Sequence, residues 1–204
     1  MKKVLGMGNA LVDMLIRIDN DHQLEKFQLP KGSMQLVNGE TSRMIRKDCA
    51  GIPSELAAGG SAANTIHGLA SLGVRTAFIG KVGDDEMGRF FAEDFKKAGC
   101  DPKLLIGKTD TGVATTFITP DSERTFATYL GSAAELTPDD LSEEMFKGYE
   151  VFHIEGYLVQ NHALIRRAVE LAKSSGCTVS LDLASYNVVE ANLDFLTSLI
   201  GHGI

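Results

Sequence analysis

An aspartate follows the first apolar run of the chain. Residues 4–7 (Val-Leu-Gly-Met) are typical of a buried strand, and Asp13 ends the segment Gly-Asn-Ala-Leu-Val-Asp at residues 8–13. Open α/β sheets bind their ligands at the carboxyl ends of the strands. A carboxylate at that edge can accept two hydrogen bonds from neighbouring hydroxyls. Asp13 is therefore a candidate for holding a polyhydroxylated compound; the alternative is that it only caps a turn.

The same segment begins like a dinucleotide-binding fingerprint. Gly6 and Gly8 occupy the first two positions of G-x-G-x-x-G, but Leu11 stands where the third glycine is needed for close packing of helix and strand. A dinucleotide-dependent oxidoreductase is therefore a weaker hypothesis than the two functions described below.

A glycine pair leads into the first clear helical pattern. Gly59 and Gly60 lack side chains, so a ligand can approach the backbone closely, and the free N–H groups of a helix start can donate to its oxygen atoms. Asn64, one turn further on, offers an amide that both donates and accepts. We expect these three residues to contact a ligand; the alternative is a flexible connector followed by a buried capping asparagine.

Four other acidic residues lie in or after apolar runs. Asp84 and Asp85 precede a helical pattern, and helix capping explains them without a ligand. Glu155 and Asp182 emerge from apolar strands, where charges are uncommon unless they are paired or belong to a site. Of these four, only Glu155 is a favoured site residue.

Composition excludes several classes of partner. The chain has 204 residues, 44% of them hydrophobic, and a formal net charge of −7, which disfavours binding to nucleic acids or to anionic membranes. We expect no nucleic acid and no membrane partner, and a small-molecule ligand instead. The basic start meets glycines too soon for a signal sequence, so a cytoplasmic location is expected.

Cysteine and histidine spacings indicate no metal site and no disulfide framework. The three cysteines, expected to be reduced and buried, are Cys49, Cys100 and Cys177. The histidines considered as ligands, which share no metal-binding spacing, are His67, His153 and His162.

Alternating strand and helix patterns place these candidates. The buried strands are predicted at residues 4–7, 76–82, 151–158 and 178–183, and the helices at 61–72, 88–98, 137–146 and 161–175. Such alternation predicts an α/β fold, a three-layer sandwich with a mostly parallel central sheet.

Two stretches interrupt this alternation. Residues 14–19 with 33–38, and residues 112–130, show partial period-two alternation, and the second contains a polar turn at 119–124 typical of a hairpin. We predict that they form a small separate β-sheet that leans over the larger domain as a lid. The predicted division is an α/β core at 1–13, 39–111 and 131–204, and a lid at 14–38 and 112–130.

Three segments together resemble a known family. Residues 8–13, then 59–64 (Gly-Gly-Ser-Ala-Ala-Asn), then 80–88 (Gly-Lys-Val-Gly-Asp-Asp-Glu-Met-Gly) look like the amino-terminal signature of the ribokinase-like (PfkB) kinases of sugars and nucleosides. The resemblance implies an α/β domain with a β lid, ATP as phosphoryl donor and Mg²⁺. It also implies that Asp13, Gly59, Gly60 and Asn64 hold substrate hydroxyls, and Glu155 matches a carboxylate that several sugar-using members bring to the same pocket.

The family's second signature is missing from this sequence. That motif, Asp-Thr-x-Gly-Ala-Gly-Asp, supplies the general base and an anion hole, and the Asn-x-x-Glu segment associated with magnesium is missing too. No catalytic residue is therefore assigned, and we expect the core to be incomplete at its carboxyl end, with an exposed apolar edge. The last residues, 201–204, fit poorly as a continuation of the apolar helix before them, which suggests a truncated protein that is inactive by itself.

Two functions follow from this resemblance. The first is an ATP-dependent kinase of ribokinase, fructokinase or adenosine kinase type, of which this chain carries the substrate-binding part. The alternative is a non-catalytic module that binds a polyol or forms a homodimer through its lid strands. The adenosine-kinase-like segment at 8–13 and the sugar-kinase-like Glu155 point to different substrates, so the choice between sugar and nucleoside stays open.

Overall fold

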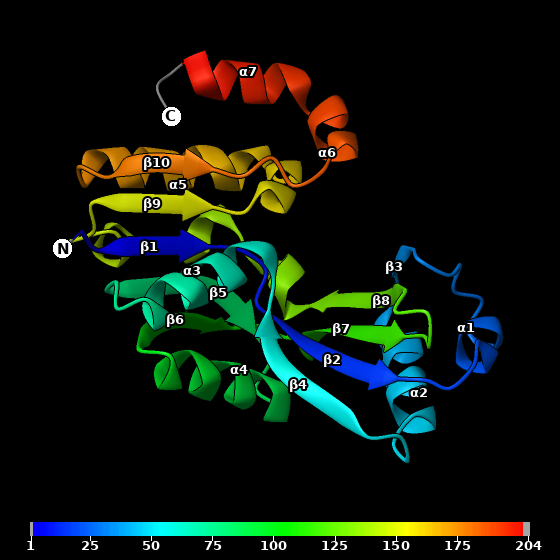
Figure 1. Cartoon of the computed structure of the whole chain (residues 1–204). Coiled ribbons are helices and arrows are strands. Elements are labelled where there is room, and N and C mark those ends of the chain that lie inside the picture. The colour runs from blue at the N-terminus through cyan, green and yellow to red at the C-terminus, as the bar shows by residue number, and fades with distance from the viewer. Residues whose placement is uncertain (1, 202–204) are drawn as a thin grey trace.

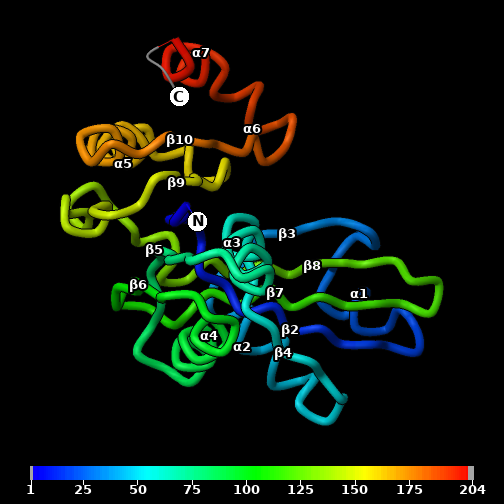
Figure 2. The backbone as a smooth tube through the Cα atoms, turned by 60° about the vertical axis from the view of Figure 1, so that its left-hand side comes forward, coloured from blue at the N-terminus to red at the C-terminus, as the bar shows by residue number. Residues whose placement is uncertain are grey.

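The computed structural model describes residues 2–201 and contains two five-stranded sheets. Figure 1 shows the first sheet on the left and the second extending from it to the right, and Figure 2 shows the same two bodies from another side. The chain passes from the first sheet to the second between β1 (Val4–Met7) and β2 (Leu11–Arg17). The short connection at residues 8–10 is therefore where the two sheets meet.

The first sheet is entirely parallel and has the order β10-β9-β1-β5-β6. Its other strands are β5 (Thr76–Val82), β6 (Cys100–Ile106), β9 (Val151–Ile154) and β10 (Thr178–Leu181). The predicted α/β class is confirmed. Two strands end earlier than expected, and β6 was not predicted because Pro102 interrupts its apolar pattern; as an outer strand it tolerates the missing N–H.

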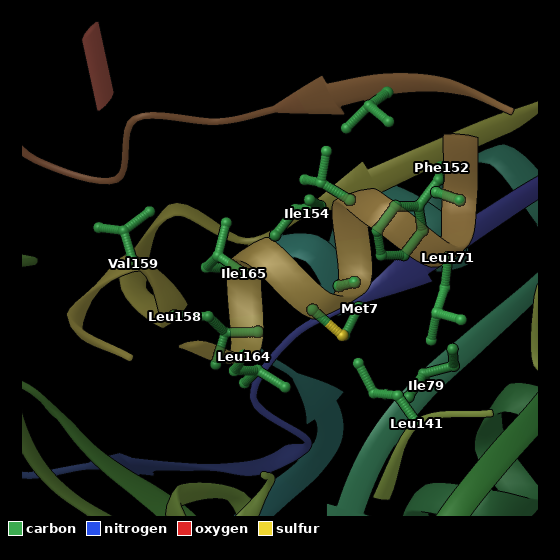
Figure 3. Close-up of a cluster of buried hydrophobic side chains, with 14 of the residues drawn as sticks. Met7, Ile79, Leu141, Phe152, Ile154, Leu158, Val159, Leu164, Ile165 and Leu171 are labelled. Atoms are coloured by element: carbon green, nitrogen blue, oxygen red, sulfur yellow. The ribbon is translucent and has the colours of Figure 1, made fainter. Parts of the chain in front are cut away.

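Helices cover both faces of this sheet. On one face, α3 (Ser61–Ser71) and α4 (Glu86–Lys97) bury Ile66, Phe91 and Phe95 against Phe78 of β5. On the other face, α5 (His162–Ser174) packs on Met7, Ile79 and Phe152, as Figure 3 shows. Alternate residues of each strand thus point to opposite helical layers, which gives the three-layer arrangement predicted from the apolar runs.

Glycines end three of the helices where the sequence predicts. Gly73, Gly99 and Gly176 follow α3, α4 and α5 with φ values of 83°, 85° and 82°. This left-handed conformation is nearly free of cost only for glycine, so each helix stops at a residue that can adopt it.

The predicted helix at 137–146 is wrong. The segment forms two 3-10 turns, η2 (Pro138–Asp140) and η3 (Glu143–Met145), after a first turn η1 (Ser132–Glu135). Thr137 and Asp140 form a capping box as the sequence suggests, but Leu141 between the turns is extended, with φ −96° and ψ 129°. This break allows both Leu141 and Phe146 to reach the core, so burial outweighs the local helix signal.

The carboxyl-terminal part of the described chain leaves apolar side chains exposed, but these lie after β10 and on the last helices and not on the edge strand β10 itself. After β10 the chain forms α6 (Tyr186–Ala191) and then α7 (Leu193–Gly201). α6 lies beside the turn η4 (Gly156–Gln160), which follows β9. The exposed apolar residues of this region are Leu183, Tyr186, Leu193 and Ile200. The expectation that the final residues do not continue the helix concerns residues 202–204, which lie outside the described range.

The second sheet has the order β3-β8-β7-β2-β4. Its other strands are β3 (Met34–Leu36), β4 (Ser54–Gly59), β7 (Thr111–Ile118) and β8 (Arg124–Gly131). The hairpin predicted within residues 112–130 is confirmed as the antiparallel pair β7–β8. β4 also belongs to this sheet, although we expected it in the larger domain; the two-domain division itself remains a prediction.

Helices close one face of the second sheet. Ile45 of α2 (Gly39–Asp48) and Leu24 of α1 (His22–Lys26) share a buried cluster with Ile16, Phe117 and Ala127 of the strands. The opposite face carries Asp13. The second sheet therefore has one closed face and one open face, and the candidate site residue lies on the open one.

Asp85 fastens the second sheet to the first. Its side chain caps α4 by accepting a hydrogen bond from the Gly88 N–H at 2.8 Å, and it also accepts from the N–H (2.7 Å) and the hydroxyl (2.6 Å) of Thr111 at the start of β7. Burial alone would raise the pKa of Asp85, but the hydrogen bonds from Thr111 and Gly88 outweigh it and lower the pKa.

Replacing Asp85 with alanine should lower the free energy of unfolding by about 2 kcal/mol, since a cap and two charge-assisted bonds are lost. Because the folded-state pKa is lowered, this contribution is present above the unfolded-state pKa and is lost as the pH falls through the folded-state value. Urea unfolding at pH 7 and at pH 3 measures both effects. Asp84→Ala is the control, because Asp84 is exposed and forms an exposed ion pair with Arg89; equal losses in the two variants would contradict the role of Asp85.

Candidate functional site

Asp13 lies directly against the first glycine of the pair. In the antiparallel pairing of β2 and β4, Leu11 is opposite Gly59 and Asp13 is opposite Ala57. A Cβ atom added to Gly59 would lie 2.4 Å from the carboxyl carbon of Asp13, so only glycine leaves room for this carboxylate. Burial raises the pKa of Asp13. Within residues 2–201, no protein group donates a hydrogen bond to this carboxylate, so its oxygens are available to a ligand.

The second glycine begins α3 in a conformation that favours glycine. Gly60 has φ 107° and ψ 144°, and an added Cβ would lie 2.2 Å from the backbone oxygen of Asn9. Its carbonyl accepts the N–H of Asn64 at 2.8 Å, which closes the first turn. Asn64 is exposed, so it is not the buried capping residue of the alternative reading. The predicted group of Asp13, Gly59, Gly60 and Asn64 is thus gathered within one helical turn and one strand pair.

Glu155 has surroundings that differ from those of Asp13. It follows β9 directly and is 2% exposed. One carboxylate oxygen accepts a hydrogen bond from the Asn9 side-chain amide, and the other accepts from the Ala62 N–H at 3.2 Å. Burial raises the pKa of Glu155, the bonds from Asn9 and Ala62 oppose this, and the negative charge of Asp182 adds to it. Both oxygens therefore already have protein donors.

Asp182 reaches the same helix from the end of β10. Its carboxylate accepts hydrogen bonds from the Ser61 hydroxyl at 3.2 Å and from the Ala184 N–H at 2.7 Å. An open pocket of about 400 Å³ lies beside this pair, lined by Ser61, Asp182, Leu183, Ala184, Ser185, Tyr186 and Val189. Asn9, Ser61 and Ala62 were not predicted as site residues; the signal that could have indicated them is their position inside the two glycine-containing segments.

The open face of the second sheet presents two rows of side chains. Strand register places Leu36, Thr128, Ala114, Asp13 and Ala57 in one row, and Met34, Phe126, Thr116, Leu15 and Glu55 in the next. The first row surrounds the carboxylate with small residues and ends at Leu36, which is 64% exposed; in the second row Met34 is 49% exposed. A ligand held by Asp13 would therefore meet apolar surface on one side.

The described residues do not form a metal site or a membrane span. Across residues 2–201, no group of three or more His, Cys, Asp or Glu side chains could hold a metal ion. Of the three carboxylates near the start of α3, those of Glu155 and Asp182 accept hydrogen bonds from protein groups, and that of Asp13 has no donor within residues 2–201. No helix in the same range is long and apolar enough to cross a membrane.

Comparisons with known proteins give consistent matches. The sequence profile described as "pfkB family carbohydrate kinase" matches residues 53–198. "Fructokinase-1" of Zea mays is 35% identical over 133 residues, covering 62% of this chain and 41% of that protein. "5-dehydro-2-deoxygluconokinase" of Geobacillus thermodenitrificans is 33% identical over 133 residues, covering 61% of this chain and 40% of that protein.

Solved structures show the same fold over nearly the whole chain. The crystal structure of an adenosine kinase from Sinorhizobium meliloti has a TM-score of 0.83 and 34% identity, and the match covers 99% of this chain and 62% of that one. A probable sugar kinase from Rhizobium etli has a TM-score of 0.84 and 30% identity, with coverages of 99% and 62%. The matches thus span about two fifths of the curated relatives and about three fifths of the solved structures.

Proposed function

This chain belongs to the pfkB family of carbohydrate kinases, and on that premise we propose that the whole protein transfers the γ-phosphoryl group of ATP to a hydroxyl of a sugar or nucleoside. This chain would hold the acceptor. The observation that carries the proposal is the contact of Asp13 with Gly59 at the start of α3. An unpaired carboxylate beside exposed helix-start backbone is suited to binding neighbouring hydroxyls.

ATP and Mg²⁺ enter this proposal through the family. The described residues offer no metal-binding group, and the sequence has no Gly-Ala-Gly-Asp motif that could place a general base and an anion hole. No residue of this chain is therefore assigned a catalytic role. Loss of a general base typically costs a factor of about 10² to 10⁴ in rate, so these 204 residues by themselves should show no measurable turnover.

The open face of the second sheet favours a nucleoside among the acceptors. A sugar alone would satisfy Asp13 and the helix start, but it would leave the exposed side chains of Leu36 and Met34 facing water. A planar, weakly polar base attached to the sugar would cover these side chains. We propose that Asp13 and Asn64 hold the sugar hydroxyls while the base lies against the two rows on the open face.

Replacing Met34 and Leu36 together with serine should weaken binding of adenosine about tenfold and leave the weaker binding of ribose unchanged, since only the base loses apolar contact. Calorimetric titration of this chain with adenosine, ribose and fructose measures the effect. Leu72→Ser is the matched control, because Leu72 is exposed at the far end of α3. Equal losses for adenosine and ribose would contradict the assignment of the base to this face.

An assay of the intact gene product can distinguish the kinase from the non-catalytic alternative. If release of ADP in a coupled assay is seen with adenosine, ribose or fructose, the kinase is supported; if every acceptor is silent while calorimetry still detects binding, the binding module is favoured. A homodimer through the lid strands belongs to the same alternative. Because α1 and α2 cover one face of the second sheet, such a dimer would have to use an edge strand or the open face.

We also propose a cytoplasmic location. The three cysteines are free and buried, as expected for a protein kept in a reducing compartment.

A further inference from the structure

Three segments of the chain meet at the carboxylate of Glu155. The first is the connection between the two sheets, whose Asn9 donates its side-chain amide, and the second is the start of α3, whose Ala62 donates its N–H at 3.2 Å. The third is Glu155's own strand, where its N–H donates to the Met7 carbonyl at 2.9 Å and extends the pairing of β9 with β1. One side chain therefore links β9, the crossing between the sheets and the helix start.

Both linked segments carry proposed ligand groups. Asn9 lies four residues before Asp13, and Ala62 lies midway between Gly60 and Asn64. The backbone oxygen of Asn9 also packs against Gly60, close enough that a Cβ at Gly60 would be 2.2 Å from it. The side chain and the carbonyl of Asn9 are thus fixed at the same time, which sets the position of β2 relative to α3.

Glu155 is shielded from any ligand in the site. It is 2% exposed, and Gly8 closes over it so tightly that a Cβ at Gly8 would lie 2.5 Å from its carboxylate oxygen. Glu155 was predicted from the family resemblance to contact substrate hydroxyls, but it is 2% exposed and its two carboxylate oxygens accept hydrogen bonds from Asn9 and Ala62.

We propose that Glu155 is a positioning residue: its carboxyl group holds Asn9 and the start of α3 together, and so sets the spacing between Asp13 and the glycine pair. The proposal rests on the proposed function, because the spacing matters only if those groups bind one acceptor. Its two partners are both donors, and a carboxylate supplies an acceptor on each oxygen. Burying a carboxylate without a neighbouring cation costs free energy of folding. Such a group is therefore uncommon at a position that serves the structure alone.

The test compares Glu155→Gln with Glu170→Gln, an exposed change on α5. A glutamine can accept only through its oxygen, so its amide must face one of the two donors and that bond is lost. We expect adenosine binding by this chain to weaken about tenfold in Glu155→Gln, while Glu170→Gln binds like the wild type. In the ligand-free Glu155→Gln protein, the NMR signals of the Ala62 amide and the Asn9 side-chain amide should shift.

The pH dependence of the free energy of unfolding provides a second test, because losing a contact between uncharged groups would not alter it. Because burial raises the folded-state pKa of Glu155, its contribution to stability is fully present below the unfolded-state pKa and is lost as the pH rises through the folded-state value. The free energy of unfolding of the wild type, measured relative to that of Glu155→Gln by urea unfolding, should therefore fall from pH 4 to pH 8. The negative charge of Asp182 also raises the pKa of Glu155. Repeating the measurement in an Asp182→Asn background separates its effect from that of burial.

The outcomes separate this proposal from the proposed function. Wild-type binding in Glu155→Gln would overturn the positioning role, and weaker binding with unshifted Asn9 and Ala62 signals would mean that Glu155 contacts the ligand directly. If the wild type binds no acceptor, the proposed function fails and the positioning role is decided by the two NMR signals alone. If Glu155→Gln does not fold, the wild type is titrated with acid while the NMR signal of the Glu155 carboxyl carbon is followed. The Ala62 amide and Asn9 side-chain amide signals must then shift over the same pH range; if they do not, the positioning role is wrong.

Discussion

Alanine in place of Asp13 should weaken the binding of adenosine to this chain by about 100-fold. The carboxylate has no protein donor within residues 2–201 and lies beside Gly59, so a ligand would supply its hydrogen bonds. Two bonds from hydroxyls to a half-buried anion contribute about 3 kcal/mol, which corresponds to that factor. Calorimetry with adenosine and with ribose measures it, and both should lose affinity, because the group that Asp13 holds is the sugar.

Asp13→Asn separates charge from shape. It should bind adenosine more weakly than the wild type at pH 7, yet unfold at a higher urea concentration. Since burial raises the folded-state pKa of Asp13, its contribution to stability is present below the ordinary value of 3.8 and is lost as the pH rises through the folded-state value. The stability gain of Asp13→Asn should therefore vanish at low pH.

The control for Asp13 is Asp19→Asn, an exposed change after the end of the same strand. If Asp19→Asn loses as much affinity as Asp13→Asn, a general effect of negative charge is responsible and the site assignment is wrong. A gain in stability without any loss of binding would show that Asp13 is a structural residue.

Local signals predicted the elements where the chain changes direction at a glycine or a polar turn. The stops at Gly73, Gly99 and Gly176 and the hairpin of β7 and β8 depend on backbone conformation that the residues themselves favour. The fate of residues 137–146 could not be read in this way. There the capping box is present, but the burial of Leu141 and Phe146 against distant strands decides the backbone.

The candidate site was partly predictable for the same reason. Asp13, Gly59 and Gly60 lie in short segments whose glycines mark close approach, and the structure places them in contact. The surroundings of Glu155 depend on Asn9 and Ala62, which are 146 and 93 residues away along the chain. Sequence spacing indicated that a carboxylate reaches this region, and only the packing shows that it faces the protein.

Alanine at Gly60 should cause the largest loss of stability among these substitutions, about 3 kcal/mol in the free energy of unfolding. Two costs add: φ of 107° is unfavourable for any residue with a Cβ, and that Cβ would lie 2.2 Å from the Asn9 carbonyl, a backbone atom that cannot rotate away. Because Asn9 would have to move, its bond to Glu155 should weaken as well.

Gly73→Ala isolates the conformational cost. Gly73 has φ of 83°, and a Cβ there would meet nothing within 4 Å, so this variant should lose only about 1 kcal/mol. Urea unfolding of the two variants, with adenosine titration of each, gives the difference. Steric displacement of Asn9 should reduce binding in Gly60→Ala and leave it intact in Gly73→Ala. Equal stability losses would mean that the Asn9 backbone can move without a loss of stability. The connection between the two sheets would then be too flexible to fix the distance between Asp13 and α3.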